Sequence, residues 1–159
     1  MVARIEVGSK PGLTDPAGES LPKKAASFLG IKGMASARVL SAYTIDCELS
    51  ESELQQAGAE IFSDPITQDF SVNQPLIPPS KFSFAISVSL RPGVRDNVGA
   101  TSKEAMEDLF DRKLPGAVYT SKQYLLSGKM TKADAERIAR ELLANELIEK
   151  FEVKSPQEF

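Results

Sequence analysis

The sequence predicts an α+β fold made of two similar units in tandem. Two local patterns alternate along the chain: apolar residues at every second position, which indicate half-buried strands, and apolar residues three or four apart, which indicate helices. Both patterns recur in the same order at a constant offset of 81 positions, as between Lys10 and Arg91. A chain of 159 residues accommodates one ordinary domain or two small ones. The constant offset favours two.

The clearest repeat is a loop motif. Residues 10–18 read Lys-Pro-Gly-Leu-Thr-Asp-Pro-Ala-Gly, and residues 91–99 read Arg-Pro-Gly-Val-Arg-Asp-Asn-Val-Gly. The same offset relates Tyr43 to Tyr124. One spacing kept along the whole chain predicts a duplicated unit. The predicted divisions are repeat 1 at residues 1–73, a proline-rich linker at 74–81, and repeat 2 at 82–159.

Each repeat is predicted to begin with a strand followed by a helix. The strands are at residues 3–7 and 84–90, where apolar and polar residues alternate. In repeat 2, Thr101 and Glu104 form a capping-box pair, and in repeat 1 Ser20 is the matching cap. The apolar faces expected to be buried are Leu21, Ala25, Phe28 and Leu29 in the first of these helices and Ala105, Met106, Leu109 and Phe110 in its counterpart.

The rest of each repeat is predicted to contain two middle strands, a second helix and a last strand. Residues 37–49 and 117–127 are strand-like and long enough for a hairpin or one bent strand, and we favour two strands. The second helices begin at Ser50 with Glu53 and at Thr131 with Asp134. The last strands lie at residues 66–72 and 147–153. This β-α-β-β-α-β order is that of a ferredoxin-like unit, and we expect the two units to pack as a pseudo-twofold pair.

Composition excludes much of ordinary catalysis. The chain has no histidine and one cysteine, so it has no Ser-His-Asp triad, imidazole metal site or internal disulfide. Cys47 lies in a strand-like segment and is expected to be a core residue. The carboxylates cluster at helix starts and on exposed helix faces, which indicates no catalytic pair. We therefore expect a module that is not catalytic by itself and that holds no metal or cofactor of its own.

Composition also restricts partners and location. A pI near 5.1 argues against a general nucleic-acid binder. The sequence lacks an apolar run of about 18 residues, the length that a membrane span needs. Charged residues occupy the N-terminal segment, where a signal peptide would need its apolar core. We therefore expect a cytoplasmic protein that meets neither membrane nor nucleic acid.

The loop motif and the second helix together resemble the PurS family. The motif follows a first strand in both repeats, and residues 141–151 read Glu-Leu-Leu-Ala-Asn-Glu-Leu-Ile-Glu-Lys-Phe. PurS is the small subunit of phosphoribosylformylglycinamidine (FGAM) synthase in de novo purine synthesis. Members of the family are usually single units that dimerise. The tandem therefore resembles a PurS dimer in one chain, and it is also similar to the N-terminal domain of the large single-chain synthase.

The resemblance implies a role in assembly. A PurS-like chain brings the glutaminase PurQ onto the synthetase PurL and helps ammonia pass between them, while ATP and magnesium are bound by the synthetase. The whole enzyme converts FGAR, ATP and glutamine to FGAM, ADP, phosphate and glutamate. Turn formation explains most of the loop motif, and contact with a partner is its functional interpretation. The partner-binding candidates are Lys10, Asp15, Gly18, Arg91, Asp96 and Gly99 of the loops, with Tyr43 and Tyr124 as interface residues.

Two questions remain open at the level of sequence. A tandem regulatory module of the ACT type, which would bind a small metabolite between its halves, is the alternative function. Further self-association is compatible with either function. Residues 155–159 fit both a C-terminal tail and the edge of a longer synthetase.

Overall fold

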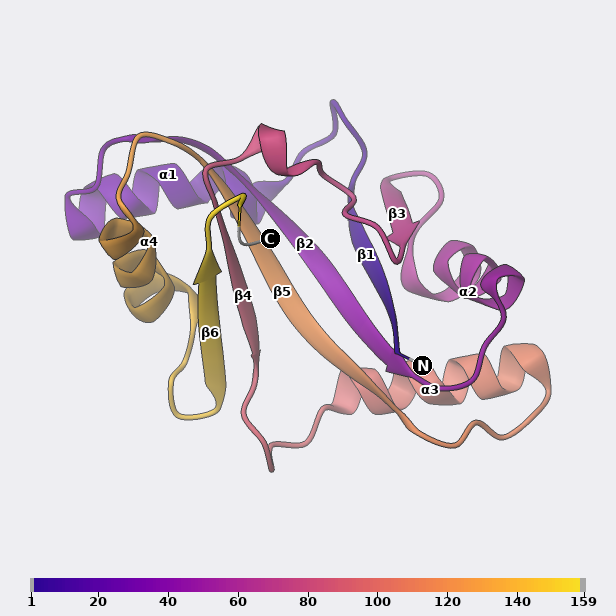
Figure 1. The fold of residues 1–159 in the computed structure, drawn as a ribbon. Coiled ribbons are helices and arrows are strands. Elements are labelled where there is room, and N and C mark those ends of the chain that lie inside the picture. Colours follow the sequence, from indigo (N-terminus) through magenta and orange to yellow (C-terminus); the bar gives the residue numbers. More distant parts are fainter. Residues whose placement is uncertain (1, 158–159) are drawn as a thin grey trace. The chain divides into compact units, whose positions relative to one another are not determined.

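The computed structural model describes residues 2–157. Met1, Glu158 and Phe159 lie outside the described residues, and so does the end of the segment that the sequence analysis interprets as a tail or as the edge of a longer synthetase. The described residues form six strands in the order β3-β1-β2-β5-β4-β6 and four helices (Figure 1). The elements are β1 (Ala3–Ser9), α1 (Pro16–Leu29), β2 (Met34–Asp46), α2 (Glu51–Ala57), β3 (Gln68–Val72), β4 (Phe84–Leu90), α3 (Asn97–Phe110), β5 (Ala117–Gly128), α4 (Lys132–Ile138) and β6 (Glu149–Lys154). β1 pairs antiparallel with β2 and β3, and β4 pairs antiparallel with β5 and β6. The predicted α+β class is confirmed.

The predicted pair of middle strands is wrong in both repeats. One long strand replaces it, β2 with 13 residues and β5 with 12. A tight hairpin needs residues that tolerate positive φ, usually Gly or Asn. Neither residue type occurs between Ala35 and Asp46 or between Ala117 and Ser127, so the chain continues as a strand.

Each compact unit takes its segments from both repeats. Unit 1 consists of residues 1–13, 41–76 and 95–120, and unit 2 of residues 14–40, 77–94 and 121–159. The first helix of each repeat therefore belongs with the outer strands of the other repeat: α3 lies in unit 1 and α1 in unit 2. β2 and β5 each contribute one part to both units. Among the described residues, each unit thus has four strands and two helices, as a ferredoxin-like unit does. The duplication itself stays a prediction.

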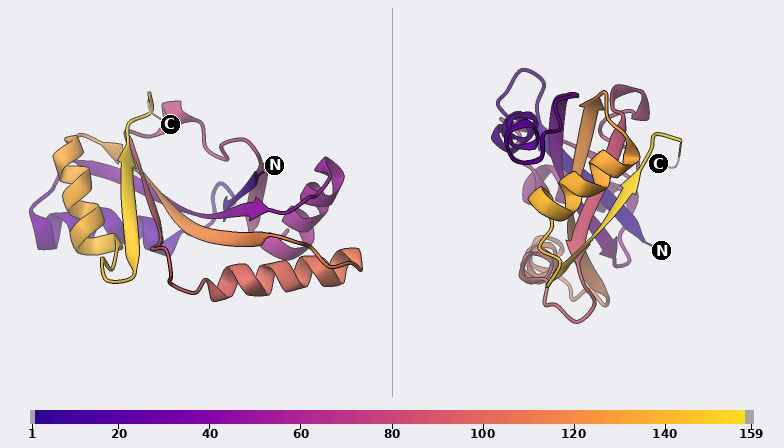
Figure 2. Two further views of the ribbon diagram at one scale, coloured as in Figure 1. Left: turned by 60° about the horizontal axis from the view of Figure 1, so that its bottom comes forward. Right: turned by 90° about the vertical axis from the view of Figure 1, so that its left-hand side faces the viewer.

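The core of unit 1 lies between its strands and helices α2 and α3 (Figure 2). Its most deeply buried side chains include Ile5, Ile45 and Met106. The capping box at the start of α2 is confirmed, because the Glu53 N–H donates to Ser50 Oγ (3.2 Å) and the Ser50 N–H donates to Glu53 Oε1 (3.0 Å).

The core of unit 2 repeats this plan with α1 and α4. Ile86, Leu126 and Ile138 are fully buried there. The capping box at the start of α4 is confirmed: the Asp134 N–H donates to Thr131 Oγ1, and the Thr131 N–H donates to Asp134 Oδ2, both at 3.1 Å. In both units the second helix ends in a π-helical turn, at Gly58–Phe62 and Ala139–Leu143.

The predicted starts of the first helices are wrong by about one turn. α1 begins at Pro16 with Asp15 as its cap, and α3 begins after Asp96. Ser20, the expected cap, lies inside α1, where its hydroxyl donates to the Ala17 carbonyl (3.1 Å). Phe28, expected in the core, is 72% exposed. The buried face of α1 consists of Gly18, Leu21 and Ala25, and Phe28 lies beyond it in the last turn of the helix.

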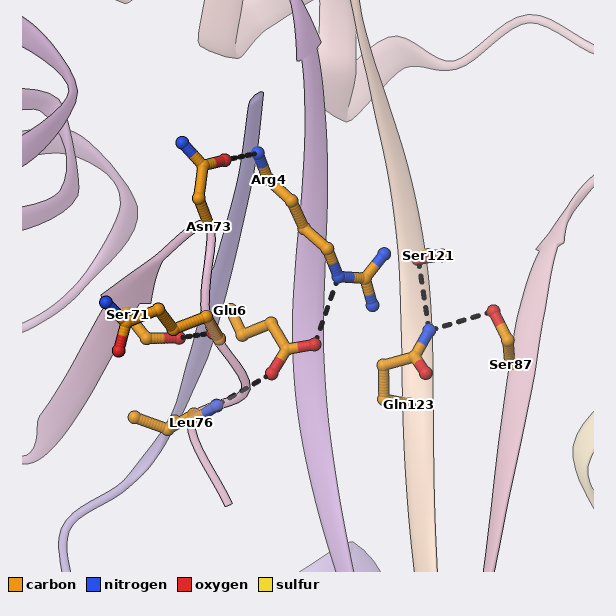
Figure 3. A network of polar contacts seen from close by, with 9 residues as sticks. Arg4, Glu6, Ser71, Asn73, Leu76, Ser87, Ser121 and Gln123 are labelled. Carbon is orange, nitrogen blue, oxygen red and sulfur yellow. Dashed lines mark hydrogen bonds and ion pairs between the residues drawn. The ribbon is translucent and has the colours of Figure 1, made fainter. Parts of the chain in front are cut away.

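The linker begins with a polar contact to β1 (Figure 3). Glu6 is 3% exposed, and its carboxylate accepts hydrogen bonds from Arg4 Nε (3.0 Å) and from the Leu76 N–H (2.9 Å). A buried carboxylate needs such partners, because desolvation of an unpaired charge is costly. In unit 2, the buried Gln123 donates to Ser87 Oγ (2.8 Å). No helix within residues 2–157 combines the length and apolar character of a membrane span.

Candidate partner-binding site

Both copies of the loop motif open with the same tight turn. The Leu13 N–H donates to the Lys10 carbonyl, and the Val94 N–H donates to the Arg91 carbonyl, each at 3.1 Å. The third residue of each turn is a glycine, with φ of 85° at Gly12 and 89° at Gly93. Pro at the second position and a left-handed Gly at the third define a type II turn. The turn chemistry expected from the sequence is therefore present in both copies.

The aspartates of the motif fasten a helix start to a strand. Asp15 Oδ1 accepts the Gly18 N–H (3.1 Å) and Oδ2 accepts the Val39 N–H (3.0 Å). In the other copy, Asp96 accepts the Gly99 N–H (2.8 Å) and both the N–H and the hydroxyl of Thr120 (2.6 to 3.0 Å). Each carboxylate caps a helix and at the same time bonds the neighbouring strand.

The glycines at the end of the motif allow the same helix and strand to meet. A β-carbon on Gly18 would lie 2.4 Å from the Ala37 carbonyl oxygen, and one on Gly99 would lie 2.0 Å from the Val118 carbonyl oxygen. Both distances are below van der Waals contact, and the opposing atoms are backbone. The Asp-x-x-Gly pattern is thus explained by internal packing. A partner-binding role for Asp15, Gly18, Asp96 and Gly99 stays a prediction.

The basic residues of the motif lie at the surface, beside the turn that precedes an edge strand. Lys10 Nζ pairs with Asp69 Oδ1 at 3.2 Å, and the Lys10 N–H donates to the Thr67 carbonyl (2.9 Å). Arg91 Nε donates to the Glu146 carbonyl (2.7 Å) and its N–H to the Ile148 carbonyl (2.8 Å). Both cations are accessible to a partner.

These turns carry two exposed apolar side chains that the sequence reasoning missed. Ile66 is 80% exposed and Leu147 is 87% exposed, at positions related by the offset of 81. Asp64 and Asn145 cap the two turns, because their side chains accept the N–H of Ile66 (2.9 Å) and of Leu147 (3.1 Å). The available signal was an Asp or Asn two residues before an apolar residue, which is typical of an Asx turn.

The two tyrosines contribute mainly to packing. Tyr43 lies opposite Ile5 in the sheet, and Tyr124 lies opposite Ile86. The Tyr43 ring meets the Phe62 ring at a centroid distance of 4.5 Å. Burial raises the pKa of both phenols, with an opposing hydrogen bond from Ser41 at Tyr43 and an additional contribution from the charge of Glu149 at Tyr124. Their role as interface residues stays a prediction.

Unit 1 also contains a cavity of about 520 Å³ beside the start of α2. Its lining includes Ala3, Cys47, Leu49 and Leu54, with Glu48 and Glu51 among the polar residues. Cys47 is 7% exposed, and burial raises the pKa of its thiol. A high thiol pKa disfavours the nucleophilic thiolate, so Cys47 is a core residue, as expected. Within residues 2–157, no group of three or more His, Cys, Asp or Glu residues is placed to hold a metal ion.

A comparison with protein families matches the second half of the chain. Residues 83–157 match the PurS family, described as phosphoribosylformylglycinamidine (FGAM) synthase. A comparison with curated proteins found no significant match. The matched segment includes the second loop motif, the second capping box and the 141–151 segment on which the resemblance rests. The resemblance to PurS is thereby confirmed for residues 83–157, which form a PurS-family segment, and the same resemblance of residues 1–73 stays a prediction.

Proposed function

We propose that the chain is a non-catalytic assembly component of FGAM synthase in de novo purine synthesis. The observation that carries this proposal is the PurS family match over residues 83–157. In the proposed complex the chain brings a PurQ-type glutaminase onto a PurL-type synthetase and helps ammonia pass from one to the other. The complex converts FGAR, ATP and glutamine to FGAM, ADP, phosphate and glutamate.

The residue composition of this chain favours a non-catalytic role in the complex. Glutamine hydrolysis by such a glutaminase uses a cysteine nucleophile, whereas Cys47 is buried with a raised pKa. The chain also has no histidine to act as a general base. ATP and magnesium are assigned to the synthetase in this proposal, and glutamine to the glutaminase.

The proposed contact regions are the two loops, with Lys10 and Arg91 as their accessible cations. Ile66 and Leu147 extend these regions, because each lies in the turn to which one of the cations is bonded. Arg91→Glu reverses an exposed charge whose side chain, among residues 2–157, bonds a backbone carbonyl and no carboxylate. It should weaken assembly and leave the thermal midpoint of unfolding nearly unchanged. A large fall in that midpoint would assign Arg91 to the fold instead.

The test of the proposed function is reconstitution with purified PurL-type and PurQ-type proteins. Size-exclusion chromatography should show a complex of all three chains, and the two enzymes alone should not form it. If the enzymes co-elute equally well without this chain, the proposal fails. A thermal-shift screen with amino acids and nucleotides addresses the ACT-type alternative, for which a clear stabilisation at millimolar ligand is required.

A further inference from the structure

The strand β6 lies at one edge of the sheet. It is the last strand in the sheet order, and among the described residues it pairs with β4 alone (Figure 1). An edge strand presents a row of backbone N–H and C=O groups that lack a strand partner, and such a row is a template for pairing with another chain. The residues of β6 read Glu-Lys-Phe-Glu-Val-Lys. These side chains decide which strand fits there.

The two faces of β6 differ in character. Phe151 and Val153 belong to the core side of unit 2, where Val153 is buried and Phe151 is partly buried. Lys150 and Glu152 alternate with them, so they lie on the opposite face, and both are exposed. Within residues 2–157, Lys150 forms no ion pair, whereas Glu152 pairs with Lys154 of the same strand at 3.7 Å. One face of the strand thus offers an aromatic ring and the other offers both signs of charge.

A second copy of the same strand is complementary to β6 on both faces. A symmetric antiparallel pair has its twofold axis at one residue, because neighbouring side chains face opposite sides of the sheet. With the axis at Phe151, the Phe151 rings of the two copies lie opposite each other on the core side. On the exposed side, Lys150 of each copy lies opposite Glu152 of the other. Aromatic pairs and opposite charges directly across from each other both stabilise antiparallel strands.

The same charges disfavour the neighbouring registers. An axis at Lys150 or at Glu152 places two like charges directly opposite each other, which destabilises a strand pair. An axis at Val153 pairs only the last part of the strand, because it places Phe151 opposite Ser155, after the end of β6. Charged residues on an edge strand guard against unspecific pairing. In β6 they do so in the neighbouring registers and favour the register centred on Phe151.

The other edge strand, β3, lacks this complementarity. Its charged residue, Asp69, is already engaged by Lys10 at 3.2 Å. An axis at Phe70, which corresponds to Phe151 at the offset of 81, would place Asp69 opposite Ser71 and form no charge pair. The comparison of the two edges therefore points to β6 as the strand that pairs with its own kind.

We propose that β6 binds β6 of a second copy of this chain, antiparallel and with the twofold axis at Phe151. The contact uses the same surface on both copies, so it closes at a dimer and does not propagate into a fibre. An interface built on one short strand lies at the small end of protein interfaces, so the dimer is expected to be weak. The proposal concerns the chain by itself and stands or falls independently of the proposed function.

The experiment measures self-association of the full chain by sedimentation velocity at about 0.1 M salt, where surface charges act within about 10 Å. The wild type should pass from monomer toward dimer between about 10 and 500 μM, as a small interface allows. Lys150→Glu makes both charge pairs repulsive by symmetry and should raise the dimer Kd at least about tenfold. Lys150→Glu/Glu152→Lys exchanges the two charges, restores opposite signs in the proposed register and should return the Kd to within about threefold of the wild type.

The matched control is Lys24→Glu, which makes the same charge change at an exposed lysine of α1 and should stay within about twofold of the wild type. Thermal unfolding checks that each variant folds, and Glu152→Lys creates like-charged pairs at the same positions if Lys150→Glu does not fold.

A wild-type chain that stays monomeric up to about 500 μM, the weak end expected of a small interface, would overturn the proposal. A dimer that Lys150→Glu leaves unchanged would place self-association on another surface and overturn it too. Equal losses in Lys150→Glu and Lys24→Glu would reduce the effect to net charge. A charge exchange that fails to restore the dimer would contradict the register centred on Phe151.

Discussion

Units 1 and 2 are built from equivalent elements, but an arginine joins the helices of each unit in a different way. In unit 1 the Arg112 guanidinium, just after α3, forms an ion pair with Glu53 of α2 and also donates to the Glu48 carbonyl. In unit 2, Arg137 of α4 donates to the Leu29 carbonyl at the end of α1 (2.9 Å). The two arginines do not correspond at the offset of 81. The two units therefore have the same arrangement of elements with different polar contacts between their helices, so the arrangement does not depend on one particular polar contact.

The largest expected effect tests which helix supports which strands. Met106 of α3 is 0% exposed in the core of unit 1, and Leu21 of α1 is 4% exposed in the core of unit 2. Truncation of either side chain to alanine should lower the free energy of unfolding by about 2–5 kcal/mol. In hydrogen exchange, Met106→Ala should loosen the amides of β1 and β3, and Leu21→Ala those of β4 and β6. The reverse pattern would contradict the assignment of α3 to unit 1 and of α1 to unit 2.

A smaller effect is expected where helix and strand meet at glycine. Gly99→Ala places a β-carbon 2.0 Å from a carbonyl oxygen, against 2.4 Å for Gly18→Ala. Relief of such overlap requires the helix to move, at a cost of about 1–3 kcal/mol, and the cost should be larger at Gly99. Urea unfolding of both variants measures the difference. Gly12 provides a contrast, because a β-carbon there meets no atom within 4 Å and only the left-handed φ opposes it.

Loss of the aspartate cap should likewise lower the free energy of unfolding more at Asp96 than at Asp15. Asp96→Ala removes hydrogen bonds to Gly99 and Thr120, and Asp15→Ala removes those to Gly18 and Val39. Each loss should cost about 1–2 kcal/mol. The cost should be greater at Asp96, which also binds the Thr120 hydroxyl at 2.9–3.0 Å, than at Asp15, whose further partner is a more distant Arg38 at 3.6 Å. Ser20→Ala is the control and should change stability by less than about 0.5 kcal/mol. A larger loss of stability at Ser20 than at Asp15 would contradict the observed start of α1 and favour the predicted start at Ser20.

The smallest expected effect is a difference between the two units in how their stability depends on pH. The hydrogen bond from Arg112, with help from the Ser50 N–H, lowers the pKa of Glu53 from 4.5 to about 2. A lowered pKa in the folded state stabilises the fold above the ordinary pKa, and this contribution is lost as the pH falls from about 4.5 through about 2. Glu53→Gln should therefore reduce the acid sensitivity of the thermal midpoint slightly in that range. Arg137 of unit 2 bonds the Leu29 carbonyl and also pairs with the exposed Glu141 (3.0 Å). Arg137→Gln should therefore change the acid sensitivity less than Glu53→Gln does, because an exposed ion pair within one helix contributes little to stability.

Local patterns predicted the elements whose determinants are themselves local. The alternation at residues 84–90 gave β4 with its bounds as found, and both capping boxes formed where Ser50 and Thr131 indicated. The starts of α1 and α3 were missed because Asp15 and Asp96 gain a second partner from a strand more than 20 residues away. Nothing near Ser20 or Thr101 carries that information.

The assignment of helices to units depended on contacts that no window of sequence contains. α3 follows β4 along the chain but shares a core with Ile5 and Ile45 of the other repeat. At the candidate site, the loop motif was found from its repetition, and its turn geometry followed from residue types, whereas the caps at Asp15 and Asp96 were not predicted. Ile66 and Leu147 were missed because an apolar residue at the start of an expected strand is ordinarily buried, and here the Asx turn turns it outward.

The most direct test of the proposed function compares two nitrogen sources in one assay. The PurL-type synthetase and PurQ-type glutaminase are supplied with FGAR, ATP and magnesium, and FGAM formation is measured with glutamine or with ammonium chloride, with and without this chain. A component that assembles the complex and helps ammonia pass between sites should raise the glutamine-driven rate at least about tenfold, equivalent to about 1.4 kcal/mol in the barrier. The ammonium-driven rate should change little, because free ammonia bypasses the glutaminase. A glutamine-driven rate that is the same with and without the chain would contradict the proposed function.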